Sequence, residues 1–339
     1  MTTPPLLHDV TPPTHWKHQE QLPSLGALYG KVAAGTVGAT LSSLIGKITP
    51  GTSATGKGSG SLPTAGWKVT GQAVSRQQVD DYIQLFGATG AIGHDTVPSL
   101  ALHIATFPLS MGMMASKNFP LPLLGLVHLD HTVDHLHPVA IDQPLIVTTW
   151  ADSLGAHRRG TTVAIWVQIH DEANPRKLLW QGRATYLSRG IFLAGRPEAE
   201  TGSEDSDSAG SAHRDFQPPV ATASWRLPAD TGRNYAGVSG DVNPIHMNHL
   251  TAKALGMPGM IAHGMYLAGR MLAGREPQAP FSWQISFAKP VTLPTTVAVA
   301  VEHSSEEVTE FTGWNPKKKS PHFFGQLRTA SPVAPRSAS

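Results

Sequence analysis

No cysteine occurs among the 339 residues of this chain. Disulfides, thiolate chemistry and cysteine-ligated zinc sites are therefore excluded, and the absence fits a cytoplasmic protein. Charge is also scarce: Asp, Glu, Lys and Arg make up 15% of the residues, and the formal net charge is +2. A net charge this small gives only a weak electrostatic field, so the composition does not predict a nucleic acid partner.

Long apolar runs are lacking as well. Residues 32–45 are interrupted by Gly, Thr and Ser, and residues 260–273 include Arg270. Both are shorter than the roughly 20 residues that a membrane-spanning helix needs. The N-terminus shows no basic region followed by an apolar stretch, so the sequence predicts neither a secretory signal nor membrane insertion.

Composition divides the chain into two large units and three weakly apolar segments. We expect an N-terminal extension over residues 1–65, partly disordered but with a candidate helix at 25–41. An acidic Ser/Gly linker at 196–215 and a short tail at 331–339 are also expected to be disordered. The two units, residues 66–195 and 216–330, are each long enough to form a core of their own.

The first unit begins with a predicted strand at 68–74. Ser75 and Gln78 then form a predicted capping box for a helix that ends at Gly87. A long apolar helix is predicted over 98–114, with a kink or break at Pro108. Four predicted strands follow, with a hairpin signal between the last two, at residues 126–136, 145–153, 161–170 and 178–187.

The second unit repeats this order of elements. A strand and a short helix precede an apolar helix predicted over 259–273, and three strands follow it. The predicted strands cover residues 220–227, 283–287, 295–303 and 323–327. The repeated order predicts an α+β protein with an internal duplication.

The second unit also contains the segment best suited to chemistry, Tyr-Ala-Gly-Val-Ser-Gly-Asp-Val-Asn-Pro-Ile-His at 235–246. Pro244 fixes its own φ and pushes Asn243 toward extended geometry, so the chain bends sharply there. The Asn243 side chain can hydrogen-bond neighbouring backbone. The bend lets Asp241 and His246 converge, hold a water and act as general acid and base.

Gly264 is expected in the first turn of the following apolar helix, where backbone N–H groups have no intrahelical partner. Because glycine has no Cβ, a carbonyl oxygen can approach that N–H closely, which makes it a candidate oxyanion site. His263 either orients the site or is an ordinary buried histidine. We place His263, Ser239 and Gly240 among the substrate-binding residues.

The run Tyr-Ala-x-x-Ser-Gly-Asp-x-Asn-Pro-Ile-His, followed by Gly-x-Ile-Ala-His-Gly-Met, resembles the signature of MaoC-like dehydratases, also called R-specific enoyl-CoA hydratase 2. The resemblance covers about residues 66–330. The first unit is similar to the non-catalytic half of double-hotdog 3-hydroxyacyl-thioester dehydratases. It implies a double hotdog, in which two antiparallel sheets each wrap a long apolar helix.

The resemblance also implies an activity: reversible dehydration of (R)-3-hydroxyacyl thioesters of CoA or acyl carrier protein to trans-2-enoyl thioesters. No metal or redox cofactor is implied. The catalytic Asp and His of the family correspond to Asp241 and His246, its structural Asn to Asn243 and its oxyanion glycine to Gly264. Many members have Asp where this chain has Asn248, a position that we interpret as a helix cap.

In the first unit, residues 87–95 replace the catalytic turn. We therefore expect one active site, with the first unit helping to form a tunnel for the acyl chain. The protein would be a monomer, in which the two hotdogs form a pseudo-dimer, or a homodimer. Two alternatives stay open: an acyl-thioesterase with the same fold, and a non-catalytic acyl-thioester-binding protein.

Two further groups of residues have competing interpretations. Histidines and aspartates at 128–137 suit a metal site in type. Strand alternation would put His128, Asp130 and Asp134 on one face and the remaining ones, His131, His135 and His137, on the other, which favours a structural strand. The run Lys317–Lys319 is interpreted as a solvated turn, with contact to a carrier phosphate as the alternative.

Overall fold

The computed structural model describes residues 6–7, 10–30, 60–87, 95–197 and 216–329. The predicted disorder of the linker and tail, and the continuation of the N-terminal helix past residue 30, lie outside these ranges. Within them, residues 25–30 are helical, as the start of that helix was predicted to be. None of the described helices is long and apolar enough to cross a membrane.

The strands form one sheet of 11 strands in the order β1-β2-β4-β5-β6-β3-β8-β11-β10-β9-β7. Neighbours are antiparallel except β1 and β2, which run parallel. The strands are β1 (Trp16–His18), β2 (Gly66–Gln72), β3 (Leu126–His135), β4 (Leu145–His157), β5 (Gly160–Asp171), β6 (Leu178–Arg189), β7 (Ala223–Leu227), β8 (Phe281–Phe287), β9 (Thr295–His303), β10 (Val308–Asn315) and β11 (Ser320–Thr329).

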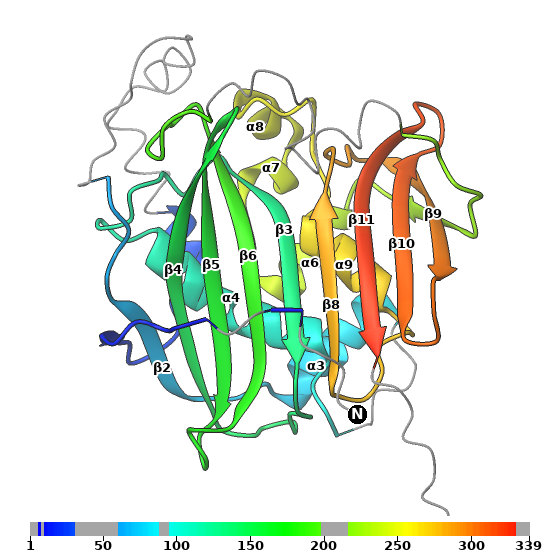
Figure 1. Cartoon of the computed structure of the whole chain (residues 1–339). Coiled ribbons are helices and arrows are strands. Elements are labelled where there is room, and N and C mark those ends of the chain that lie inside the picture. The colour runs from blue at the N-terminus through cyan, green and yellow to red at the C-terminus, as the bar shows by residue number, and fades with distance from the viewer. Residues whose placement is uncertain (1–5, 8–9, 31–59, 88–94, 198–215, 330–339) are drawn as a thin grey trace, which may run out of the picture.

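The sheet consists of two halves with the same strand order. The first half reads β2-β4-β5-β6-β3 and the second β7-β9-β10-β11-β8, so each strand except β1 has a counterpart. The halves join where β3 pairs with β8, with His131 opposite Ile285. This confirms the predicted α+β double hotdog and its duplicated element order, and shows that the two sheets are continuous (Figure 1).

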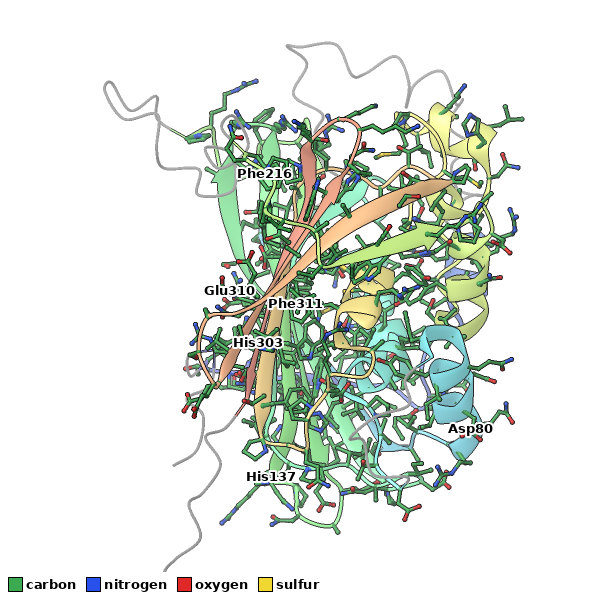
Figure 2. The ribbon with its side chains drawn as sticks, turned by 90° about the vertical axis from the view of Figure 1, so that its right-hand side faces the viewer. Asp80, His137, Phe216, His303, Glu310 and Phe311 are labelled. Carbon is green, nitrogen blue, oxygen red and sulfur yellow. The ribbon has the colours of Figure 1, made fainter. Side chains whose placement is uncertain are left out.

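The main helices cover one face of the sheet (Figures 1 and 2). In Figure 2, Asp80 lies on the outer side of the helical layer and Glu310 on the sheet side of the molecule. These helices are α3 (Arg76–Phe86), α4 (Ser99–Met114), α6 (Thr231–Ser239) and α9 (Gly264–Leu272). The capping box of α3 forms as predicted, and Gly87 ends the helix at φ 65°.

Two helix predictions differ from the structure in part. Helix α4 runs through Pro108 without a break, and a kink there stays a prediction. Helix α9 begins at Gly264 rather than at residue 259, because residues 260–262 pair with backbone at 291–293 instead: Ala262 N–H donates to Val291 C=O, and Leu293 N–H to Met260 C=O. Gly264 is consequently the first residue of the helix.

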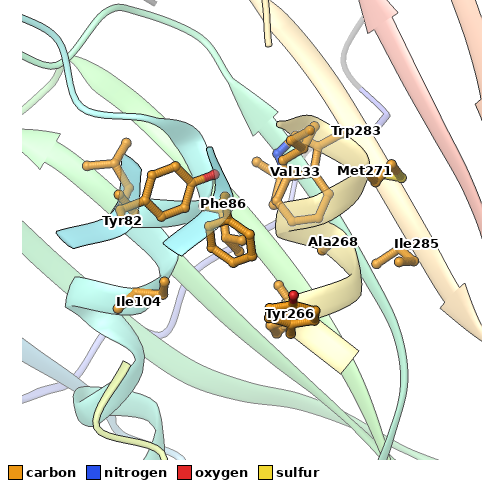
Figure 3. Packing of buried hydrophobic residues seen from close by; sticks show 14 of the residues in the cluster. Tyr82, Phe86, Ile104, Val133, Tyr266, Ala268, Met271, Trp283 and Ile285 are labelled. Carbon is orange, nitrogen blue, oxygen red and sulfur yellow. The ribbon is translucent and has the colours of Figure 1, made fainter. Parts of the chain in front are cut away.

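One core runs through both halves. Phe86 of α3 packs on α9, where its ring contacts Tyr266 with centroids 5.5 Å apart (Figure 3). A Cβ at Gly269 would collide with the Phe86 ring, so this glycine allows the close approach of the two helices. Burial of the shared core at about 25 cal/mol per Å² of apolar surface couples the halves.

Candidate active site

The turn that the sequence predicts to be catalytic lies between two short helices. Helix α6 ends at Gly240, which has φ 71°, and α7 (Pro244–Met247) begins three residues after Asp241. The Ser239 hydroxyl donates to the Tyr235 carbonyl at 2.9 Å and accepts the Asp241 N–H at 3.2 Å. Asn243 accepts the Ile245 N–H and caps α7, which is the predicted local hydrogen bond.

Asn248 likewise caps the next helix, α8 (His249–Ala254), by accepting the Leu250 N–H at 2.7 Å. The predicted capping role is confirmed. Ser239 and Gly240 shape the turn, since the hydroxyl of the first is engaged with backbone and the second supplies a left-handed residue. Their predicted contact with substrate stays a prediction.

Asp241 receives two hydrogen bonds on the same oxygen. The Tyr29 hydroxyl donates to Oδ1 at 2.6 Å, and the Asn243 N–H donates to Oδ1 at 3.3 Å. Among the described residues none donates a hydrogen bond to Oδ2. The Nε2 atom of His263 lies 3.8 Å from this oxygen. The Asp241 side chain keeps 16% of its surface exposed, so the carboxylate is reachable from the cavity.

His246 is buried, and its Nδ1 lies 2.8 Å from the Ile261 carbonyl oxygen. Because a carbonyl can only accept, Nδ1 carries the hydrogen and Nε2 of the neutral ring presents a lone pair. Burial lowers the pKa of His246, against the opposing effects of Asp241 and the Ile261 carbonyl. At neutral pH the ring is therefore an uncharged proton acceptor.

His263 stacks on His246 with ring centroids 3.6 Å apart. Its Nε2 donates to the Asp241 backbone carbonyl at 3.0 Å, which fixes both the ring and the turn. Burial, and then the neighbouring His246, hold the pKa of His263 well below its usual value. His263 Nδ1 is buried and has no hydrogen-bond partner among the described residues.

The three side chains converge. One oxygen of Asp241 and one ring nitrogen each of His246 and His263 lie within 4.8 Å of one another. Each histidine already uses one nitrogen on a backbone carbonyl, which leaves Nε2 of His246 and Nδ1 of His263, and the latter is buried without a partner among the described residues. The sequence predicted that Asp241 and His246 would meet, and the structure brings them together.

The residues at 128–137 gather no comparable set of metal-ligating atoms within the described part of the chain, so the metal interpretation is not supported. The predicted faces also need correction. A β-bulge between His128 and Asp130 shifts the register with β6 and brings the His128 ring to 5.5 Å from the His131 ring. His131 and His135 are buried and the pKa of each is lowered by burial, as in a structural strand.

Gly264 begins α9, and its N–H has no hydrogen-bond partner among the described residues. As the first residue of the helix it lies at the positive end of the dipole. A Cβ at this position would lie 2.7 Å from the Phe287 ring, so no larger residue fits unless that ring moves. The backbone there is open to an oxygen with developing negative charge.

These groups face a cavity of about 970 Å³ that both halves line. The first half contributes an apolar wall, and exposed cationic side chains occur at the solvent-facing part of the lining. The apolar residues are Phe107, Met111, Met114, Leu123 and Leu126, and the cationic ones are Arg158, Arg159, Arg189 and Lys289. The run Lys317–Lys319 lies in the exposed turn between β10 and β11 and does not line the cavity.

Comparison with known proteins identifies the family of this chain. The family described as "MaoC like domain" matches residues 207–315. The 3-hydroxyacyl-thioester dehydratase X of Mycobacterium tuberculosis is 30% identical over 248 residues, which cover 71% of this chain and 81% of that protein. The chain belongs to the MaoC-like dehydratase family. As a MaoC-like dehydratase it is an enzyme of the hydratase and dehydratase class.

Solved structures of other proteins have the same fold as this MaoC-like dehydratase. The crystal structure of HtdX from Mycobacterium tuberculosis has a TM-score of 0.64 and 28% identity, and covers 78% of this chain and 100% of the other. A MaoC-like dehydratase from Phytophthora capsici has a TM-score of 0.60 at 14% identity, over 79% and 95% of the two chains. At 14% identity, the similarity to the Phytophthora capsici protein shows a shared fold alone.

Sequence reasoning missed Tyr29. It lies 212 residues before Asp241 in a Pro- and Gly-containing segment, and no motif marks it. The predicted helix starting at residue 25 indicated that the segment packs on the main body, but not where. Only the folded chain brings this phenol to Asp241 in the candidate active site.

Proposed function

We propose that this enzyme catalyses the reversible dehydration of (R)-3-hydroxyacyl thioesters to trans-2-enoyl thioesters. The observation that carries the proposal is that Asp241, His246 and the Gly264 N–H, which has no hydrogen-bond partner among the described residues, all line one cavity. The relative from Mycobacterium tuberculosis is named a 3-hydroxyacyl-thioester dehydratase, which supports this substrate class. The (R) configuration rests on the family resemblance.

In the proposed reaction the thioester oxygen accepts the Gly264 N–H, which stabilises the enolate that forms when C2 loses a proton. A donor of this kind contributes about 3–4 kcal/mol. The Asp241 carboxylate and the His246 Nε2 lone pair are both acceptors, so together they hold a water by its two O–H groups. In dehydration, one of them takes the C2 proton and delivers it to the hydroxyl leaving C3, which departs as water.

The first half of the chain supplies the wall for the acyl group. Its apolar residues line the same cavity as Asp241 and His246. The exposed Arg158, Arg159, Arg189 and Lys289 at this cavity suit the phosphates of a CoA or acyl carrier protein thioester. Both carriers present a pantetheine arm and phosphate, and a comparison of CoA and carrier-protein substrates decides between them.

The proposal is tested with Asp241→Asn in a hydration assay on crotonyl-CoA, followed at the enoyl-thioester absorbance. The side chain keeps its size and an acceptor for Tyr29 but loses its basicity, so we expect kcat to fall by about 10²-fold or more. The exposed Asp152→Asn is the matched control and should retain wild-type turnover. Turnover of Asp241→Asn near that of the wild type would contradict the dyad.

Two further readouts separate the alternatives. A thiol reagent added to the same assay detects free CoA, which a thioesterase would release and a dehydratase would not. Pure (R)- and (S)-3-hydroxybutyryl-CoA test the stereochemistry, and dehydration of the (S) form alone would overturn that part of the proposal. A protein that binds the thioester without either reaction would be a non-catalytic binder.

A further inference from the structure

The N-terminal segment reaches the active site by wrapping around the edge of the sheet. Backbone N–H groups of Leu6 and Leu7 donate to the buried Asp134 carboxylate, on the face of the sheet away from the helices. Trp16 then packs edge-on against Trp150, and β1 extends the sheet beside β2 (Figure 1). Several independent contacts therefore anchor this segment to the first half.

Residues 25–30 continue to the opposite, helix-covered side. Leu25 packs near Gly240, where a Cβ would lie 3.4 Å from the Leu25 side chain. Tyr29 is 7% exposed and belongs to a buried cluster with Met111, Met114 and Tyr186. The ring alone would satisfy this packing, because a phenylalanine fills nearly the same volume. The hydroxyl needs a separate explanation.

That hydroxyl donates to Asp241 Oδ1 at 2.6 Å, a charge-assisted bond of short length. Burial, and then the Asp241 charge, raise the pKa of Tyr29, so the phenol stays protonated and acts as a donor. The Asn243 N–H also donates to Oδ1, whereas no described residue donates to Oδ2. Two donors on one oxygen fix the carboxylate rotamer and leave the other oxygen for chemistry.

We propose that Tyr29 is a positioning residue of the active site, which holds Asp241 so that Oδ2 faces the reacting water. The N-terminal segment, outside both hotdog units, thereby completes the catalytic centre of the second unit. This role rests on the proposed dehydration. It concerns the orientation of a catalytic group rather than contact with the reacting atoms.

Tyr29→Phe in the full-length chain removes the hydroxyl and retains the ring. We expect kcat for crotonyl-CoA hydration to fall at least tenfold with KM changed less than threefold, because Asp241 is mispositioned while the acyl wall is intact. This split between kcat and KM separates positioning from packing, because a purely structural role would lower the stability of the fold without a selective loss of kcat.

Tyr82→Phe is the matched control: Tyr82 is also buried but does not line the active-site cavity. It should keep wild-type kcat and KM. A wild-type kcat for Tyr29→Phe would overturn the proposal. So would a faster Tyr29→Phe enzyme, because the hydroxyl would then block the site. If Tyr29→Phe does not fold, a fluorinated tyrosine at position 29 keeps the shape and changes the acidity of the hydroxyl; an unchanged kcat would overturn the positioning role.

A readout without turnover separates this inference from the proposed function. The chain has five tyrosines, so tyrosine labelled with 13C at Cζ gives a simple spectrum in which Tyr29→Phe identifies the Tyr29 signal. Asp241→Asn should shift that signal by more than the Tyr82 signal, and no shift would overturn the contact. A wild-type enzyme with no dehydratase activity but with this shift would refute the proposed reaction and leave the contact standing.

Discussion

At the scale of single residues, the site depends on which atoms are already engaged. His246 uses Nδ1 on the Ile261 carbonyl and His263 uses Nε2 on the Asp241 carbonyl. Both rings are buried and their pKa values lowered, so neither carries charge at neutral pH. The candidate reactive atoms are one Asp241 carboxylate oxygen, the His246 Nε2 and the Gly264 N–H, whereas the remaining nitrogen of His263, Nδ1, is buried.

Gly264→Ala tests the last of these. The new Cβ would lie 2.7 Å from the Phe287 ring and would displace it, or would keep the thioester oxygen from the N–H. We expect kcat to fall by about 10²-fold with the fold intact, the loss typical of an impaired oxyanion donor. Stopped-flow or steady-state hydration kinetics measure this directly.

Gly237→Ala provides the control for that substitution. Gly237 is inside helix α6, and a methyl group there would have nothing within 4 Å, so alanine should be accommodated and should stabilise the helix by about 0.5–1 kcal/mol. Equal activity of the two glycine variants would show that the space at Gly264 is irrelevant to the reaction.

At the scale of elements, the first turn of α4 is held by a buried acid from the other half. Glu276 Oε1 accepts the Ser99 N–H, while Oε2 is buried without a partner among the described residues. Burial raises the pKa of Glu276 to about 8, only partly opposed by the Ser99 hydrogen bond. The side chain therefore remains protonated in the folded state at neutral pH.

This predicts a pH dependence of stability. The pKa of Glu276 is higher in the folded state than in the unfolded state. Its contribution to the free energy of unfolding is therefore complete below about pH 4.5 and is lost as the pH rises through about 8. The change amounts to about 1.4 kcal/mol for each unit of pKa difference. Urea unfolding at pH 5.5 and 8.5 should show a larger loss for the wild type than for Glu276→Gln, and equal losses would exclude this carboxyl as the cause.

Much of the element order could be predicted, because each half buries one side of a sheet against helices with clear start and stop residues. Strand β10 was missed: Val308–Asn315 is interspersed with Thr, Glu and Gly and lacks a long apolar run. The duplication implies this strand, because the first half has four strands after its long helix and the second half should then have four as well. The start of α9 was misplaced because apolar residues 260–262 suit both helix and the extended pairing that they adopt with residues 291–293.

At the scale of the molecule, Ser99 joins the two halves. Its hydroxyl accepts the indole N–H of Trp180 from the first half and of Trp283 from the second, each at 2.9 Å. All three side chains are fully buried. Together with the β3–β8 pairing, this shared acceptor makes the two hotdogs one structural unit.

Ser99→Ala should therefore destabilise the whole chain rather than one half. Two buried indole N–H groups lose their acceptor, at about 1–3 kcal/mol each. We expect a single unfolding transition in both proteins, shifted to lower urea in the variant, when intrinsic tryptophan fluorescence and circular dichroism are followed together. The exposed Ser304→Ala should leave the midpoint unchanged, and separate transitions for the two halves would contradict this view.

The sequence by itself predicted the Asn-Pro turn, the meeting of Asp241 with His246 and the duplicated order of elements. These depend on local rules: proline geometry, helix caps and the alternation of side chains along a strand. The tertiary structure alone decided that Tyr29 meets Asp241, that a bulge turns His128 toward His131, and that the two sheets join through β3 and β8. Such contacts join residues far apart in the chain, and they form only when burial of a common core brings their elements together.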